Sequence, residues 1–236
     1  MKIHNDLLGL ALMDFYSGKH DGKIIIHSPD FDEDEIKVEW YFRDFPSMPY
    51  LEKKALEFCY GKTLDVGAGA GSHSLFLQDK GLDIYAMDIS AGACNVMRSR
   101  GISAVIQGDI FQLTSNKWDT ILMMMNGIGV FGNINNLDAF LEKLPSLLNP
   151  GGQLLFDSTN LIYLFENEQG EIEIDLNREY YGQISFQLEY RDLYSPKFDW
   201  LYMDYDTLSS MADSKGLHTE LLATGENYHY LARIRI

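Results

Sequence analysis

Residues 62–88 read KTLDVGAGAGSHSLFLQDKGLDIYAMD, and this stretch predicts the fold of the surrounding chain. An apolar run at 63–66 meets three alternating glycines, and apolar residues at helical spacing follow them. Gly81 then precedes a second apolar run, which ends at Asp88. This order of strand, tight loop, helix, strand and acid is typical of a nucleotide-binding unit in a doubly wound α/β sheet.

The glycines Gly67, Gly69 and Gly71 predict a ligand site in the loop. Without a Cβ atom the backbone can turn sharply and approach a bound molecule, and the free N–H groups that open the helix favour negative or polar atoms. Asp88 follows Gly71 by 17 positions, at the end of the second strand, where a carboxylate can accept hydrogen bonds from a ribose diol. We therefore predict a nucleoside-cofactor site.

The glycine spacing differs from that of a dinucleotide site. The dinucleotide fingerprint is G-x-G-x-x-G, whereas here the third glycine comes one residue early and Ser72 stands at the last position. An acid, Asp65, also lies two residues before Gly67. Both features disfavour a nicotinamide cofactor. A glycine loop can also be a tight turn without a ligand, but the flanking strand, helix and acid make that the weaker alternative.

The run LDVGAGAG at 64–71 resembles motif I of the class I S-adenosylmethionine-dependent methyltransferases, and YAMDIS at 85–90 resembles their next, acidic strand end. The resemblance covers residues 60–160 and includes LLNPGGQLLFD at 147–157. It implies an α/β fold with a doubly wound, mostly parallel seven-stranded sheet of the Rossmann-like methyltransferase type. The last strand of this fold is reversed, and YLARIRI at 230–236 fits that strand.

The resemblance also implies S-adenosylmethionine as cofactor, S-adenosylhomocysteine as product, and a role for each matching position. The first acid and the glycine loop would hold the methionine end, the second acid the ribose, and the acid after the third strand, with the next backbone N–H, the adenine. The loop at the motif IV position would lie near the reacting sulfur. These residues are Asp65, Gly67, Ala68, Gly69, Gly71, Asp88, Ile89, Asp109, Ile110, Asn126 and Gly127.

No general base stands out in the sequence. Asp157 and Tyr163 are candidate catalytic residues by position alone, because they follow the fifth predicted strand on the edge where open α/β sheets bind ligands. Asn160, at the same strand end, is a candidate substrate contact. His73, at the start of the helix after the glycine loop, is interpreted as a structural residue.

The segment VEWYFRDFPSMPYLE at 38–52 gathers aromatic residues around one cation, Arg43. Methyltransferases of this class often close the active site with residues before motif I, so the resemblance implies a lid. In it, Tyr41 would contact substrate, and Arg43 would bind a substrate carboxylate or the methionine carboxylate. Equally, the aromatic cluster can simply pack the cap, with Arg43 paired to Asp44 or Glu52.

Two regions extend the minimal fold. Residues 1–60 predict an N-terminal helical cap, with an amphipathic helix from Leu7, a short strand at 23–27 and a solvated acidic loop, DFDEDE, at 30–35. Residues 61–236 form the cofactor-binding domain, with an antiparallel β insertion at about 161–204 after the fifth strand. The insertion is expected to cover the cofactor or to form a homodimer contact. In the first case five of its residues would shape a substrate pocket: Tyr163, Tyr190, Arg191, Trp200 and Tyr202.

The composition of the chain limits the kinds of binding partner that we expect. The chain has 236 residues and a net charge of -16, and such an acidic surface repels phosphate backbones, so we expect no nucleic-acid substrate. Two distant cysteines predict neither a disulfide framework nor a metal site. The sequence has no signal-peptide pattern and no apolar stretch that approaches a membrane span, so we expect a cytoplasmic protein without membrane association.

Three functions are compatible with the sequence. The first is methyl transfer to a small-molecule acceptor by direct displacement. The second is a non-catalytic cofactor-binding or interaction protein, and the third, less favoured by the glycine spacing, is a nicotinamide-dependent oxidoreductase. The loop after the fourth strand, Asn126-Gly127-Ile128-Gly129, lacks the prolines that nucleobase-amine and glutamine methylases carry there.

Overall fold

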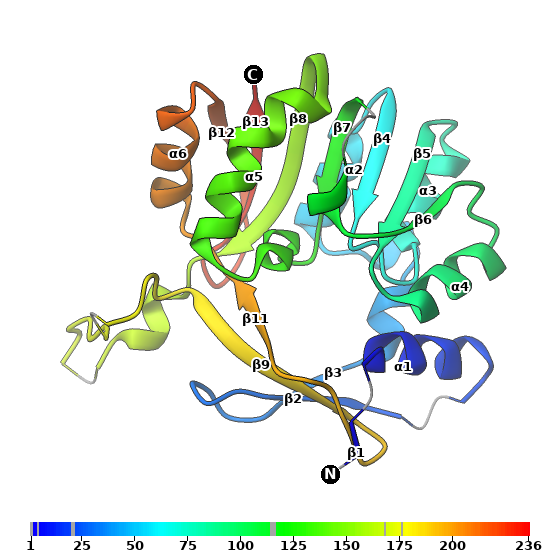
Figure 1. The fold of residues 1–236 in the computed structure, drawn as a ribbon, viewed down its shortest axis with the longest axis horizontal. Coiled ribbons are helices and arrows are strands. Elements are labelled where there is room, and N and C mark those ends of the chain that lie inside the picture. Colours follow the sequence, from blue (N-terminus) through cyan, green and yellow to red (C-terminus); the bar gives the residue numbers. More distant parts are fainter. Residues whose placement is uncertain (1, 4, 20–21, 114–116, 168, 176) are drawn as a thin grey trace.

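The computed structural model describes residues 2–3, 5–19, 22–113, 117–167, 169–175 and 177–236. Within them a seven-stranded sheet has the order β12-β13-β8-β7-β4-β5-β6 (Figure 1). Five neighbouring strands are parallel, namely β8, β7, β4, β5 and β6. Strand β13 is antiparallel to both of its neighbours. The predicted Rossmann-like fold class is confirmed. The strands are β4 (Lys62–Val66), β5 (Asp83–Asp88), β6 (Val105–Gln107), β7 (Trp118–Met123), β8 (Leu148–Thr159), β12 (His218–Thr224) and β13 (His229–Arg235).

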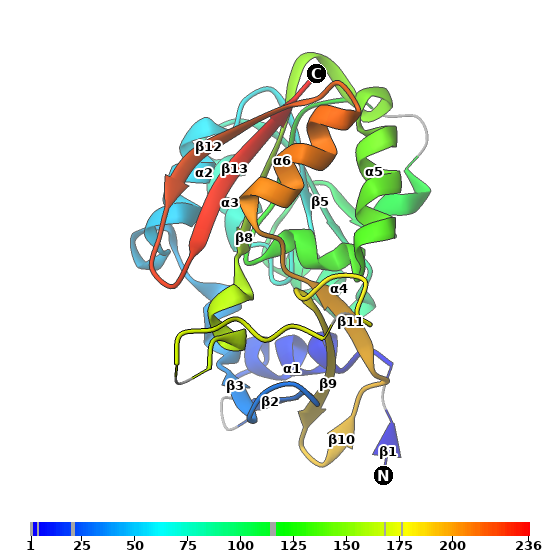
Figure 2. The same ribbon diagram turned by 90° about the vertical axis from the view of Figure 1, so that its left-hand side faces the viewer.

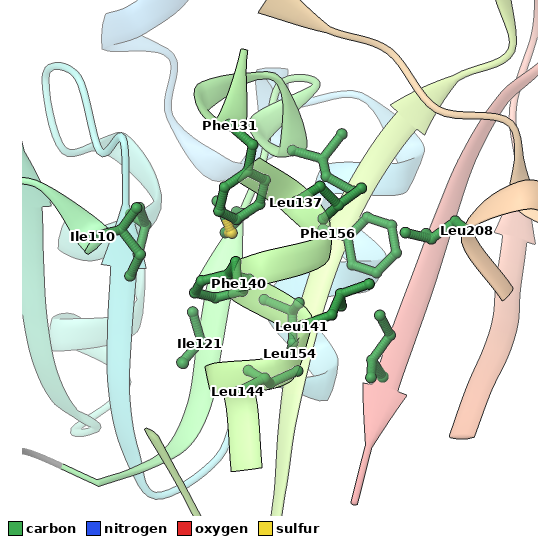
Figure 3. Close-up of a cluster of buried hydrophobic side chains, with 14 of the residues drawn as sticks. Ile110, Ile121, Phe131, Leu137, Phe140, Leu141, Leu144, Leu154, Phe156 and Leu208 are labelled. Atoms are coloured by element: carbon green, nitrogen blue, oxygen red, sulfur yellow. The ribbon is translucent and has the colours of Figure 1, made fainter. Parts of the chain in front are cut away.

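Helices cover both faces of this sheet, which explains why the central strands are largely apolar. Successive residues of a strand point to opposite faces: Ile121 and Leu154 pack with α5 and α6, whereas Leu122 and Leu155 pack with α2 and α3. Figure 3 shows the α5 side of this core. The helices are α2 (Tyr50–Phe58), α3 (Ser72–Asp79), α4 (Ala91–Ser99), α5 (Ile134–Leu147) and α6 (Tyr205–Ser214).

A second, smaller sheet lies across the carboxyl ends of the parallel strands (Figures 1 and 2). Its central strand β9 pairs with β2 on one edge and with β10 and β11 on the other. The N-terminal cap and the insertion therefore form one sheet. The strands are β1 (Lys2–Ile3), β2 (Ile24–His27), β3 (Asp34–Ile36), β9 (Gln183–Tyr190), β10 (Leu193–Tyr194) and β11 (Phe198–Leu201).

Helix α1 (Leu7–Tyr16) joins the two sheets. It packs against α4, and its N-cap residue Asp6 also accepts hydrogen bonds from Ser90 Oγ at 2.7 Å and Gly92 N at 2.9 Å. Tyr190 and Arg191 both reach Asp14 of this helix, at 3.2 and 2.8 Å. These two residues, which the sequence analysis expects in a substrate pocket, thus anchor α1 to the small sheet.

Several predicted boundaries shift. The aromatic segment forms two short 3₁₀ helices, η1 (Val38–Phe42) and η2 (Phe45–Ser47), before α2. The end of the acidic loop pairs with β2 as strand β3 and is thus not wholly a loop. Other 3₁₀ turns follow strands of the large sheet: η3 (Ile110–Gln112), η4 (Gly127–Phe131) and η5 (Leu161–Phe165).

No helix in the described part of the chain has the length and apolarity that crossing a membrane requires. The same residues contain no group of three or more His, Cys, Asp or Glu side chains that could hold a metal ion.

Candidate functional site

The glycine loop connects β4 to α3 at the carboxyl edge of the large sheet. Gly69 and Gly71 have φ of +57° and +80°, a left-handed conformation that side chains rarely adopt. A Cβ on Gly69 would lie 3.0 Å from the ring of Tyr41, so the loop and the aromatic segment approach closely. Gly71 provides the N-cap of α3.

Asp88 ends β5 beside this loop. Its carboxylate accepts hydrogen bonds from Gly69 N at 2.9 Å and from Ser90 N at 2.8 Å. Burial raises the pKa of Asp88, although the two N–H donors oppose the shift. The side chain therefore lies in a dry position, oriented by backbone donors.

A cavity of about 320 Å³ lies against the loop, and we call it the glycine-loop cavity. It gathers the ends of β4, β5, β6 and β7, and it is closed by residues of α1, η1 and β11. Seven of the predicted cofactor residues line it: Gly67, Gly69, Asp88, Ile89, Asp109, Ile110 and Gly127. Tyr41, predicted as a substrate contact, lies in its wall together with Trp200.

A much smaller polar cavity, of about 20 Å³, lies on the other side of the loop. It is lined by Arg43, Glu52 and His73, and also by Asp65 and Ala68 from the predicted cofactor set. Gly71 lines neither this small polar cavity nor the glycine-loop cavity among the described residues, and its place is the N-cap of α3.

Glu52 is the centre of the charged side chains around the small polar cavity. It pairs with Arg43 Nη2 at 2.5 Å and with His73 Nε2 at 2.8 Å. Burial alone would raise the pKa of Glu52, but His73 and Arg43 hold it below its usual value. Burial alone would lower the pKa of His73, but Glu52 and Asp65 raise it. The pairing of Arg43 with Glu52, weighed as an alternative from the sequence, is what the structure contains.

Asp65 lies under the loop and is almost fully buried. It accepts a hydrogen bond from Ser74 Oγ at 2.6 Å, and burial raises its pKa. Arg43 Nε is also buried, and no described residue accepts a hydrogen bond from it. An unsatisfied buried donor is unusual in a folded protein, and here it belongs to a cavity wall.

The loop after β7 forms the next part of the site. Asn126 has φ of +54°, and its Oδ1 accepts from Thr159 Oγ1 at 2.8 Å. A Cβ on Gly129 would lie 1.9 Å from Trp200 Nε1, so the indole of β11 packs directly on this turn. The small sheet therefore contacts the large sheet at the carboxyl ends of its parallel strands.

A third cavity, of about 510 Å³, shares four wall residues with the glycine-loop cavity: Leu8, Tyr41, Met125 and Trp200. We call it the aromatic cavity. Its aromatic lining is Trp40, Tyr41, Phe186, Phe198, Trp200 and Tyr202. Arg43, Asn126 and Asp157 from the predicted set also line it.

Asp157 lies two residues before the end of β8 and is fully buried. Its Oδ2 lies 2.8 Å from His229 Nε2, and its Oδ1 accepts weakly from Gly127 N at 3.4 Å. His229 opens β13 and also lines the aromatic cavity. Sequence reasoning missed His229, although a signal existed: the reversed last strand begins at the edge where the parallel strands end.

Tyr163 and Asn160 do not join Asp157 in the aromatic cavity. Tyr163 stacks on Tyr228 at 5.4 Å between ring centroids and lines an open outer cavity next to the aromatic cavity. Asn160 Oδ1 accepts from Ile162 N at 2.9 Å and from Tyr181 Oη at 2.8 Å, so its side chain orders the turn at η5.

A family model described as a methyltransferase domain matches residues 64–156. A crystal structure of an S-adenosylmethionine-dependent methyltransferase from Bacteroides fragilis, in complex with S-adenosyl-L-homocysteine, is similar over the whole chain. The TM-score is 0.92 and the sequence identity 41%, with 100% of this chain and 97% of that chain covered.

More distant structures share the fold alone. The CcbJ methyltransferase from Streptomyces caelestis is 13% identical, with a TM-score of 0.62 over 82% of this chain and 92% of that chain. A S-adenosylmethionine-dependent methyltransferase from Clostridium acetobutylicum is 14% identical, with a TM-score of 0.58 over 81% and 93%. The comparison with curated proteins found no match.

Proposed function

The chain belongs to the family of S-adenosylmethionine-dependent methyltransferases, and from this premise we propose that it methylates a small-molecule acceptor. One observation carries the proposal: the glycine-loop cavity and the aromatic cavity share a wall, so a cofactor in one would face an acceptor in the other. At about 510 Å³ the aromatic cavity has the size of a small-molecule site.

The residues present fit the cofactor. When bound, S-adenosylmethionine supplies a methyl group carried on a positively charged sulfur. The loop is a cradle that side chains would fill, Asp88 suits the ribose diol, and Asp109 with Ile110 N suits the adenine. The buried, unsatisfied Nε of Arg43 suits the methionine carboxylate, beside Asp65 and Ala68.

The chain's own residues have three tasks in this reaction. Trp200 and Tyr41, which belong to both cavities, separate and align the two ligands and exclude water. The turn at Asn126 and Gly127 shapes the junction between the cavities. The third task, proton removal from the acceptor, we assign to His229.

The contact with Asp157 supports this assignment. A carboxylate accepts the hydrogen bond, so the ring proton lies on Nε2 and Nδ1 keeps its lone pair. No described residue forms a hydrogen bond with that Nδ1. Asp157 is thus a positioning residue for His229 in this proposal. Tyr163 has no role in it, because it lines only the outer cavity.

Calorimetric titration with S-adenosylmethionine, S-adenosylhomocysteine and NADH tests the cofactor. We expect both adenosyl ligands to bind and NADH not to bind. Asp88→Ala should weaken the binding of both adenosyl ligands by roughly 10- to 100-fold. The substitution removes the two hydrogen bonds that the ribose diol would donate to the charged carboxylate. Binding of NADH without either adenosyl ligand would refute the proposal.

Turnover separates small acceptors from macromolecular ones. The purified chain, S-adenosylmethionine and a size-fractionated cell extract are combined, and S-adenosylhomocysteine formation is measured. The proposal expects product with the small-molecule fraction. Product with only the macromolecular fraction would overturn the assignment of a small acceptor.

A further inference from the structure

The acidic loop, which the sequence predicts as a solvated face, lines a route to the aromatic cavity. The open outer cavity that Tyr163 lines has a volume of about 1030 Å³, and we call it the acidic cavity from here on. Residues 30–34 of the loop, and residues 28–29 just before it, line this cavity. It shares five wall residues with the aromatic cavity: Ile26, Asp34, Phe186, Tyr202 and His229. An acceptor that enters the aromatic cavity from this side passes the acidic loop.

The charge along this route is negative. Five carboxylates line the acidic cavity: Asp30, Asp32, Glu33, Asp34 and Glu226. No described Lys or Arg residue lines it. Arg178 pairs with Asp30, and His27 Nδ1 pairs with Glu33 at 3.0 Å, but no cation pairs with the other three among the described residues.

The aromatic cavity adds no free positive charge. Arg43, the one Lys or Arg among its described lining residues, is neutralised by Glu52, and His229 is bonded to Asp157. Asp34 remains at the junction of the two cavities. An anionic acceptor would meet unpaired carboxylates here, whereas a cation would be attracted.

Aromatic side chains line the same two cavities as Asp34. Tyr202 and Phe186 belong to both cavities, and the two indoles of Trp40 and Trp200 lie in the aromatic cavity. Burial, followed by the fields of Tyr163 and Asp34, raises the pKa of Tyr202 to about 12, so its ring stays a neutral phenol. Aromatic faces beside a carboxylate are the combination that binds an ammonium ion with an apolar body.

We propose that the acceptor is a small organic amine, which enters as an ammonium ion through the acidic cavity and binds between Asp34 and the aromatic walls. The inference rests on the proposed function and names its substrate class. In the reaction, the ammonium ion first gives one N–H proton to His229 Nδ1, and the electron pair of that N–H bond, left on nitrogen as a lone pair, forms a bond to the methyl carbon. The carbon–sulfur bond breaks, and its electron pair stays on the sulfur.

Three probes of one shape and different charge test the proposal: benzylamine, benzyl alcohol and benzoate. Each is titrated by calorimetry at neutral pH into the full chain saturated with S-adenosylhomocysteine. We expect benzylamine to bind about tenfold more tightly than benzyl alcohol, the range of a cation over aromatic faces. Benzoate should bind more weakly than both, and added salt should weaken only benzylamine.

A matched pair of variants locates the effect. Asp34→Asn keeps the side-chain oxygen that accepts from Glu35 N and removes the charge, and it should weaken benzylamine roughly threefold. Asp213→Asn, on an exposed position of α6 that lines no described cavity, makes the same charge change elsewhere and should leave binding unchanged. Benzyl alcohol should bind alike to all three proteins.

The outcomes separate the two levels of inference. If S-adenosylhomocysteine fails to bind, the proposed function falls and the amine inference falls with it. If it binds but benzoate equals or exceeds benzylamine, only the amine inference is overturned. Equal losses of benzylamine affinity in Asp34→Asn and Asp213→Asn would also overturn the amine inference, because the attraction would then come from the overall charge of the protein.

Discussion

The two sheets of this molecule build their halves of the site in different ways. The glycine-loop cavity is formed largely by backbone and strand ends within residues 66–130, in the order of the chain. The aromatic cavity takes its walls from residues 8–52, from the ends of β7, β8 and β13, and from β9 and β11. The cofactor half is therefore local in sequence, and the acceptor half depends on long-range strand pairing.

This difference has a physical cause. A tight glycine turn and a strand-end carboxylate need only their own segment and the strand beside it. Side chains such as Trp200 and Tyr202 reach a common cavity only after β9 has paired with β2, about 160 residues earlier in the chain. If the halves are separable, substitutions in one should leave ligand binding in the other intact.

The largest expected effect is on His229. His229→Gln should lower kcat by about 10²- to 10⁴-fold with any accepted substrate, the usual contribution of a general base. S-adenosylhomocysteine affinity should stay at the wild-type level. Steady-state rates of the wild type and the variant, measured beside S-adenosylhomocysteine titration, check both expectations. A kcat within a few-fold of the wild-type value would assign proton removal to another group.

Gly129→Ala tests the contact between the two sheets. The new Cβ would overlap the Trp200 indole, so we expect β11 to shift and the free energy of unfolding to fall by about 1–3 kcal/mol. Acceptor binding should weaken, whereas S-adenosylhomocysteine binding should change less. Urea unfolding and calorimetry measure both. Equal losses of the two ligands would show that the halves are not separable.

Gly69→Ala is the converse change, on the cofactor side. Gly69 has a φ of +57°, and a Cβ there would lie 3.0 Å from the Tyr41 ring. The added methyl group should therefore lower the free energy of unfolding by about 1 kcal/mol or more. We expect S-adenosylhomocysteine to bind several-fold more weakly at unchanged acceptor affinity. Gly81→Ala, whose glycine also has positive φ but open space around it, provides the matched control for backbone strain alone.

The smallest expected effect is a pH dependence of stability from His73. Its pKa is raised in the folded state by Glu52, so its contribution is fully present below the unfolded value of 6.5. The contribution is lost as the pH rises through the folded-state pKa. Urea unfolding on both sides of that range should show a decline in the wild type that His73→Gln lacks. A parallel decline in the variant would contradict the assignment.

Much of the large sheet could be predicted from the sequence alone. The glycine loop, the acid at Asp88 and the apolar run of β7 each report a local requirement of backbone conformation or burial. The predicted mostly parallel, seven-stranded sheet and its reversed last strand agree with the sheet that the structure contains. The glycine spacing also distinguished this loop from a dinucleotide fingerprint without any coordinates.

Which residues line the acceptor half of the site was decided only by the tertiary structure. Tyr190 and Arg191 follow the same alternation as their neighbours, yet they anchor α1, and nothing local distinguishes them from Tyr202 in the cavity wall. His229 gains its partner Asp157 only because β13 runs antiparallel beside β8. Sequence periodicity encodes which face of a strand is buried, whereas the identity of the facing residue depends on which distant strand pairs with it.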